Sequence, residues 1–193
     1  MLPIETERLI LRHLQARDLE DYLGYRNDPE VARYQGWEHI TREQAEITVN
    51  DQAILAPGTS GKTFLFAVEL KSEGRLIGDL GMMIREHDPH QGMTGYTFSR
   101  AYQGKGYATE AFIGMLDLMF DPDGPNMHRI FALVEPENIP SVKLLERAGF
   151  RREGHFIQAR WFKGRWVDDY QYAMLQSEWH EKRPPTRYFQ SSR

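Results

Sequence analysis

The sequence contains no cysteine among its 193 residues. This absence excludes disulfide bonds, thiolate metal sites and a cysteine nucleophile, and it is compatible with a reducing cytoplasm. The sequence also lacks an apolar run of about 20 residues, the length that a membrane-spanning helix needs. Its first residues show no basic segment followed by an apolar stretch. We therefore expect a soluble, cytoplasmic protein with no secretion signal and no membrane partner.

An excess of positive charge is missing as well. The chain has 24 Lys and Arg residues against 28 Asp and Glu residues, and its formal net charge is −4. Broad nucleic-acid-binding faces need clustered basic residues, so we expect no nucleic-acid partner. No internal repeat and no Pro/Gly/Ser-rich linker divides the sequence. We expect one domain at residues 1–180, followed by a polar tail at residues 181–193.

The spacing of apolar residues predicts a mixture of strands and helices. Expected strands are residues 8–13, 63–70, 75–84, 95–100, 128–134, 154–162 and 165–175. Expected helices are residues 16–27, 41–55 and 138–148, together with a long helical pattern whose apolar stripe runs from residue 108 to residue 119. Because hairpins dominate and only the last two helices need crossover connections, we expect an α/β (α+β) domain. Its sheet is predicted to be mixed, mostly antiparallel and flanked by helices.

A glycine-containing loop lies between the predicted strand at residues 95–100 and a long helical pattern. Residues 103–109 read Gln-Gly-Lys-Gly-Tyr-Ala-Thr. Gly104 and Gly106 allow a close approach of the backbone to a ligand. The unpaired N–H groups and the dipole at a helix start attract anions without basic side chains. The loop therefore predicts a phosphate site, although a plain glycine-rich turn is the alternative.

Four other patterns have structural interpretations beside the functional ones. Residues 56–63 approach the P-loop pattern, but helical sequence precedes them and a strand follows, the reverse of what that motif needs. Residues 87–90, His-Asp-Pro-His, suggest metal ligands, yet we expect a solvated turn and no metal there. Glu110 is either catalytic or, as we favour, a partner of the helix dipole. The aromatic hairpin at residues 161–172 fits a substrate pocket or a core edge equally well.

A second motif follows at residues 138–150, where Asn138 or Ile139 is expected to cap a helical segment that ends before Gly149. The two motifs in this order resemble the GCN5-related N-acetyltransferase (GNAT) superfamily. Weaker likenesses, beginning with Glu-Arg-Leu-Ile-Leu-Arg at residues 7–12, extend the resemblance from residue 5 to about residue 179. They are similar to the branch that contains the ribosomal-protein N-acetyltransferases RimJ and RimL.

The resemblance implies that acetyl-CoA is the co-substrate. It would lie in a wedge where the strand at residues 95–100 splays away from the strand at residues 128–134. Its pantetheine arm would pair with main-chain groups of Thr97, Phe98 and Ser99. An N–H on the Phe98 side would polarise the thioester carbonyl. The pyrophosphate would be held by the loop residues Gln103, Gly104, Lys105, Gly106, Tyr107, Ala108 and Thr109.

The resemblance also implies direct attack by a neutral primary amine. Many relatives carry a tyrosine acid at the position of Leu145, and RimL-like relatives carry a glutamate at the position of Arg160, so both groups are missing here. RimL-like relatives have a serine at the position of Ser141, which could hydrogen-bond the CoA sulfur. We take Ser141 and Asn138 as catalytic candidates, with Asn138 also touching the cofactor. Candidates for the base are Asp79, Glu135 and His155.

The acceptor that we expect first is a protein N-terminal α-amine, because of the likeness to RimJ and RimL. A small amine, such as an aminoglycoside-type drug or a polyamine, is the enzymatic alternative. A non-catalytic CoA-binding regulator is a third hypothesis, since the tyrosine and the glutamate are absent. The acceptor pocket would be built from residues 35–39, a loop at residues 86–93 and the aromatic hairpin. A homodimer is common among such relatives.

Overall fold

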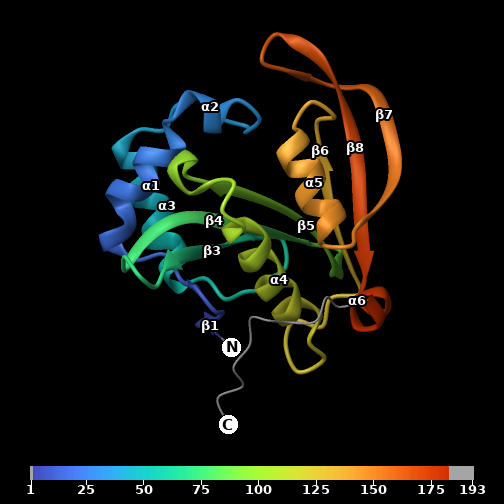
Figure 1. Ribbon diagram of the computed structural model, residues 1–193, viewed down its shortest axis with the longest axis horizontal. Helices are drawn as coiled ribbons and strands as arrows, with labels where there is room; N and C mark the ends of the chain where they lie inside the picture. Colours follow the sequence, from blue (N-terminus) through green and yellow to red (C-terminus); the bar gives the residue numbers. More distant parts are fainter. Residues whose placement is uncertain (1, 183–193) are drawn as a thin grey trace.

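The computed structural model describes residues 2–182, which form an eight-stranded sheet with helices on both faces (Figure 1). The strand order is β1-β2-β3-β4-β5-β6-β8-β7. The strands are β1 (Ile4–Glu5), β2 (Leu9–Arg12), β3 (Thr63–Leu70), β4 (Arg75–Arg85), β5 (Asp88–Phe98), β6 (Arg129–Val134), β7 (Arg151–Phe162) and β8 (Arg165–Leu175). Between them lie α1 (Leu19–Arg26), α2 (Pro29–Ala32), α3 (Arg42–Ile54), α4 (Tyr107–Phe120), α5 (Ile139–Arg147) and α6 (Gln176–Lys182). Short 3-10 turns occupy Ala16–Asp18 and Arg100–Tyr102.

The predicted mixed, mostly antiparallel sheet is confirmed. Across residues 2–182, neighbouring strands pair in antiparallel fashion except β5 and β6, which run parallel. No helix in this range is long and apolar enough to cross a membrane. Of the predicted polar tail, residues 181 and 182 end α6, and residues 183–193 lie outside the described residues.

The prediction of a loop at residues 86–93 was wrong. Strands β4 and β5 continue to pair as far as Arg85↔Asp88, so the chain turns within two residues, Glu86 and His87. Asp88 and His90 are therefore strand residues, despite their polar side chains. Main-chain pairing between two long strands outweighs the turn preference of the Asp-Pro sequence here, and a register shift beside Arg85 absorbs the irregularity.

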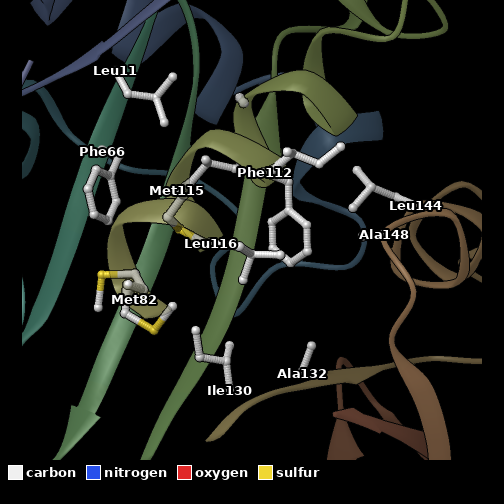
Figure 2. Close-up of a cluster of buried hydrophobic side chains, with 14 of the residues drawn as sticks. Leu11, Phe66, Met82, Phe112, Met115, Leu116, Ile130, Ala132, Leu144 and Ala148 are labelled. Atoms are coloured by element: carbon white, nitrogen blue, oxygen red, sulfur yellow. The ribbon is translucent and has the colours of Figure 1, made fainter. Parts of the chain in front are cut away.

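Two hydrophobic cores lie on opposite faces of the sheet. Residues of β3 alternate between them, since Phe64 and Phe66 join the core under α4 whereas Ala67 joins the core under α1 and α3. Figure 2 shows the side chains of α4 packed between the sheet and α5. Of the six residues in the apolar stripe predicted for this helix, Ala108 is partly buried and five are fully buried: Ala111, Phe112, Met115, Leu116 and Met119. This packing fixes the start of α4 relative to the sheet.

A buried ion pair joins α1 to β4 on the other face. The Arg26 guanidinium lies 2.8 Å from both carboxylate oxygens of Asp79, and the Tyr25 hydroxyl donates to the same carboxylate at 2.6 Å. The guanidinium also lies over the rings of Tyr22 and Trp37, 4.6 and 4.1 Å from their centroids. All three polar partners are buried. Asp79 therefore has a structural role in holding α1 against the sheet.

We expect Asp79→Asn to lower the free energy of unfolding by about 3 kcal/mol, because it leaves the buried Arg26 without its counter-charge. The matched control is Glu20→Gln, which removes the partner of Arg42 in an exposed pair. That change should cost less than about 0.5 kcal/mol. Urea unfolding of the three proteins measures the difference, and equally small losses in both variants would contradict the structural role.

Candidate active site

The glycine loop presents the start of α4 to solvent. Gly104 and Gly106 have φ angles of 74° and 83°, in the left-handed region that glycine adopts without strain. Gly106 is the N-cap residue, and no side chain from the described part of the protein caps the helix. The first turn consists of Tyr107, Ala108 and Thr109, all partly exposed, so its main-chain N–H groups are available to an anion.

Glu110 fastens this loop to the N-terminal segment. Its carboxylate is fully buried and accepts hydrogen bonds from the Thr6 hydroxyl at 2.6 Å and from the Arg8 main-chain N–H at 2.8 Å. The Arg8 guanidinium pairs with it at 2.7 Å and donates to the Lys105 carbonyl at 3.1 Å. The ring of Tyr107 lies 4.5 Å below this guanidinium. Glu110 is thus an anchor for the loop, in agreement with the structural interpretation of its position.

Strands β5 and β6 form a wedge. They pair over three residue pairs, which end at Met93↔Phe131, and no further pairing joins them in the described structure. Beyond this point the edge of β5 faces a cavity of about 110 Å³ instead of a neighbouring strand. Polar side chains from five segments line the cavity: Tyr34, Gln35, Tyr96, Glu135, Asn138, Ser141 and Arg160.

Two side-chain amides show which main-chain groups of β5 lie on its open edge. The Tyr96 carbonyl accepts a hydrogen bond from Gln35 Nε2 at 3.2 Å. The Phe98 carbonyl accepts one from Gln103 Nε2 at 2.9 Å. Because the N–H and C=O of one strand residue point to the same side in antiparallel pairing, the main-chain groups of Tyr96 and Phe98 both face the wedge.

The neighbouring residues turn the other way. Thr97 is buried and pairs with Asp79 of β4, and the Ser99 N–H donates to a carbonyl of β4 at 2.9 Å. Of the three residues expected to pair with the pantetheine arm, Phe98 therefore presents its main-chain groups to the wedge. The main-chain groups of Tyr96, two residues before Phe98, also face the wedge, and sequence reasoning missed this residue. Strand alternation before the loop was the available signal for this residue.

Helix α5 brings Ser141 to the opposite wall of the cavity. Asn138 is the predicted N-cap, and its side-chain oxygen accepts the Ser141 N–H at 3.3 Å. The Ser141 hydroxyl lies 2.5 Å from the Tyr96 hydroxyl. Burial raises the pKa of Tyr96 above its usual value, and the hydrogen bond with Ser141 opposes this only in part. Leu145 is fully buried in the core and does not line the cavity.

Of the three candidates for the base, only Glu135 lines the cavity. Its two carboxylate oxygens accept hydrogen bonds from Arg160 and Arg165, each at 2.9 Å. Asp79 is held by the α1 ion pair. His155 lies on the exposed strand β7, where Nε2 is 2.7 Å from an oxygen of Asp168.

Three other sequence patterns, the P-loop-like segment, the possible metal ligands and the aromatic hairpin, can now be located in the structure. Residues 56–63 connect α3 to β3, so the order of helix and strand is the reverse of a P-loop, as predicted. The structure gathers no group of three metal-ligating side chains within its described range. The aromatic hairpin is divided, since Tyr172 is buried in the core whereas Trp161 and Trp166 are exposed by 62% and 55%.

Known proteins are similar to this chain in sequence and in fold. The family model described as acetyltransferase (GNAT) domain matches residues 8–151. The chain belongs to the GNAT acetyltransferase family. It is 34% identical over 177 residues to an uncharacterized N-acetyltransferase, YnaD, of Bacillus subtilis, covering 92% of this chain and 99% of that protein. It is 28% identical over 185 residues to the ribosomal protein uS5-alanine N-acetyltransferase of Escherichia coli, covering 91% and 92%.

Solved structures agree with this GNAT assignment. A GNAT-family acetyltransferase from Bacillus anthracis superposes with a TM-score of 0.80 and 33% identity, covering 92% of this chain and all of that chain. The spermidine N-acetyltransferase of Vibrio cholerae, in complex with CoA and spermine, superposes with a TM-score of 0.76 and 26% identity, covering 90% and 98%. The protein is thus an N-acetyltransferase of a fold that uses acetyl-CoA.

The residues present fit this co-substrate. The uncapped start of α4 suits a diphosphate, because its N–H groups and its dipole attract negative charge. The unpaired edge of β5 suits an extended amide-containing arm, which can pair with it as a strand would. The two features are close along the chain, since β5 ends at Phe98 and α4 begins at Tyr107.

We expect Gly104→Ala to raise the dissociation constant of CoA about tenfold, because a residue other than glycine pays about 1–2 kcal/mol to keep a positive φ. No protein atom lies within 4 Å of the added Cβ, so the fold itself tolerates the change. The matched control is Gly24→Ala in α1, where φ is not positive and the space is equally open. Isothermal titration calorimetry measures both, and an unchanged dissociation constant for Gly104→Ala would contradict the role of the loop.

Proposed function

We propose that this N-acetyltransferase acetylates the N-terminal α-amine of a protein. The observation that carries the proposal is that arginines already pair with the carboxylates at the cavity wall. Glu135 is the carboxylate that lines the cavity among the described residues, and Arg160 and Arg165 already bind both of its oxygens. The nearby Asp169 is likewise paired with Arg160 at 3.0 Å. Within residues 2–182 the cavity therefore offers no unpaired carboxylate, either as a base or as a partner for a cationic acceptor.

The lack of an unpaired base favours an amine that is already partly neutral. An α-amine titrates near pH 8, so about one molecule in ten is neutral at pH 7, whereas a lysine or polyamine amine, with a pKa near 10.4, is neutral in fewer than about one in a thousand. An enzyme that relies on positioning can use the first kind of amine directly. The second kind needs a base close to the attacking nitrogen.

The same ion pairs disfavour a polyamine for a second reason. A polyamine carries several positive charges, which are recognised by unpaired carboxylates. In this protein a polyamine would have to displace two arginines from Glu135, which is 4% exposed and would lose its charge-assisted hydrogen bonds. The relatives include enzymes of both kinds, a ribosomal protein uS5-alanine N-acetyltransferase and a spermidine N(1)-acetyltransferase. The paired carboxylates support an acceptor of the first kind, a protein N-terminus.

The groups around the wedge take the following proposed roles. The Phe98 main-chain N–H donates to the thioester carbonyl oxygen, where negative charge develops as the amine attacks. The loop at residues 103–109 binds the diphosphate. The Ser141 hydroxyl donates a hydrogen bond to the departing sulfur, and Asn138 holds the turn of α5 that carries Ser141. These roles need no ionised side chain at the reacting atoms.

Thiol release from acetyl-CoA tests the acceptor class. We expect turnover with peptides that have a free N-terminus and a lysine, because the α-amine is partly neutral. The matched control is the same peptide with a formylated N-terminus, which keeps the lysine and should give no turnover. Turnover with spermidine and none with free-N-terminus peptides would contradict the protein N-terminus as acceptor. If neither kind of amine causes thiol release, catalysis itself is contradicted and a CoA-binding regulator is favoured.

We expect Ser141→Ala to lower kcat about tenfold to a hundredfold with little change in KM, because the hydroxyl acts on the leaving sulfur. Steady-state kinetics with a free-N-terminus peptide measures the two constants. Ser60→Ala is the control, since its hydroxyl caps an exposed loop away from the wedge. A kcat for Ser141→Ala equal to that of the wild type would remove this side chain from the mechanism.

A further inference from the structure

Tyr96 reaches across the wedge to the proposed sulfur donor. It lies on β5, whereas Ser141 lies on α5, so the two side chains come from opposite walls of the cavity. The Tyr96 hydroxyl is 2.5 Å from Ser141 Oγ and 3.1 Å from the Ser141 carbonyl oxygen. Its ring packs edge-on against Phe112 of α4, with centroids 5.6 Å apart, so the hydroxyl is held in place.

We propose that Tyr96 is a positioning residue that orients the Ser141 hydroxyl toward the sulfur of the co-substrate. The inference rests on the role proposed above for Ser141 and names the group that makes this role possible. A serine hydroxyl has one proton and two acceptor lone pairs. Either hydroxyl can donate across the 2.5 Å that separates Tyr96 from Ser141 Oγ. In the proposed arrangement the tyrosine donates, which leaves the serine proton for a partner in the cavity.

The distances identify Ser141 Oγ as the main partner of the phenol. A separation of 2.5 Å is at the short end of the range for O–H···O hydrogen bonds, whereas 3.1 Å lies beyond its usual limit. Burial keeps the phenol in its protonated form throughout the neutral pH range. Hydrogen bonds in a chain also polarise one another, so a serine that accepts from Tyr96 is a stronger donor than a serine alone.

The chemical balance of acetyl transfer is unchanged by this pair. The C–N bond forms, the C–S bond breaks, and the electron pair of the broken bond goes to sulfur. The proton that the amine loses passes through water and finally reaches the sulfur. Ser141 and Tyr96 donate hydrogen bonds to the negative charge in the interval and keep their protons, so no co-reactant is required.

The pair also accounts for Leu145 at the place where many relatives have a tyrosine. Leu145 is fully buried in the hydrophobic core, and it packs there instead of facing the cavity. A phenol hydroxyl nevertheless enters the wedge, from the facing strand. Sequence comparison along α5 alone does not reveal it, because the residue belongs to β5.

The test compares Tyr96→Phe, Ser141→Ala and the double variant. We expect Tyr96→Phe to lower kcat about tenfold with KM for acetyl-CoA unchanged, since one hydrogen bond is lost and the ring remains. In the Ser141→Ala background the same substitution should have no further effect. The matched control is Tyr25→Phe, which removes a more deeply buried phenol with a 2.6 Å hydrogen bond on the other face of the sheet and should leave kcat unchanged.

A second measurement does not depend on turnover. The pKa of the thiol of bound CoA, followed by the ultraviolet absorbance of the thiolate, should rise by about half a unit to one unit in Tyr96→Phe and in Ser141→Ala. The inference would be overturned if Tyr96→Phe had the same thiol pKa and the same kcat as the wild type. It would also be overturned if the losses in kcat from the two substitutions multiplied in the double variant. If the wild type acetylates no amine but the thiol pKa shifts as expected, the proposed acceptor fails and the inference stands.

Discussion

The site depends on the point at which β5 and β6 stop pairing. Up to Met93 and Phe131 the two strands run side by side, and beyond them the edge of β5 carries main-chain groups with no strand beside it. An open edge inside a sheet is costly unless something else satisfies it. Here the side chains of Gln35 and Gln103 donate to its carbonyls. The open edge lets an extended, amide-containing ligand take the place of a strand.

The two sequence motifs are arranged around this opening by helix packing. The loop before α4 follows the end of β5, and a short connection, residues 135–137, separates β6 from the cap of α5. Both helices are anchored on the same core, α4 by its fully buried stripe and α5 by Leu144 and Leu145. The start of each helix therefore faces the wedge from a fixed position. Activity by positioning requires this rigidity, since small displacements of reacting groups are costly in rate.

Much of this arrangement could be predicted from the sequence. Local rules were sufficient for the glycine loop, for Asn138 as the cap of α5 and for the hairpin of β3 and β4, because each depends on residues close together in the chain. The prediction failed at residues 86–93, where pairing between two long strands extended through polar residues. Local preference was a poor guide there because the decisive hydrogen bonds join separate segments.

The chemistry of the cavity was harder to predict for the same reason. Tyr96 meets Ser141 across 45 positions of sequence, and Glu135 meets Arg160 across 25. These contacts exist only once the sheet order places β6 between β5 and β8. Sequence reasoning could nominate Glu135 as a base, but it could not show that two arginines already bind it. That contact is the basis for proposing an α-amine and not a polyamine as the acceptor.

The most direct test of the account is a crystal structure of the protein with CoA. The account predicts the diphosphate against the main-chain N–H groups at the start of α4, and the pantetheine arm between β5 and β6 with its amides bonded to the edge at Tyr96 and Phe98. A diphosphate bound away from the glycine loop, or a wedge closed by direct pairing of the two strands, would contradict it.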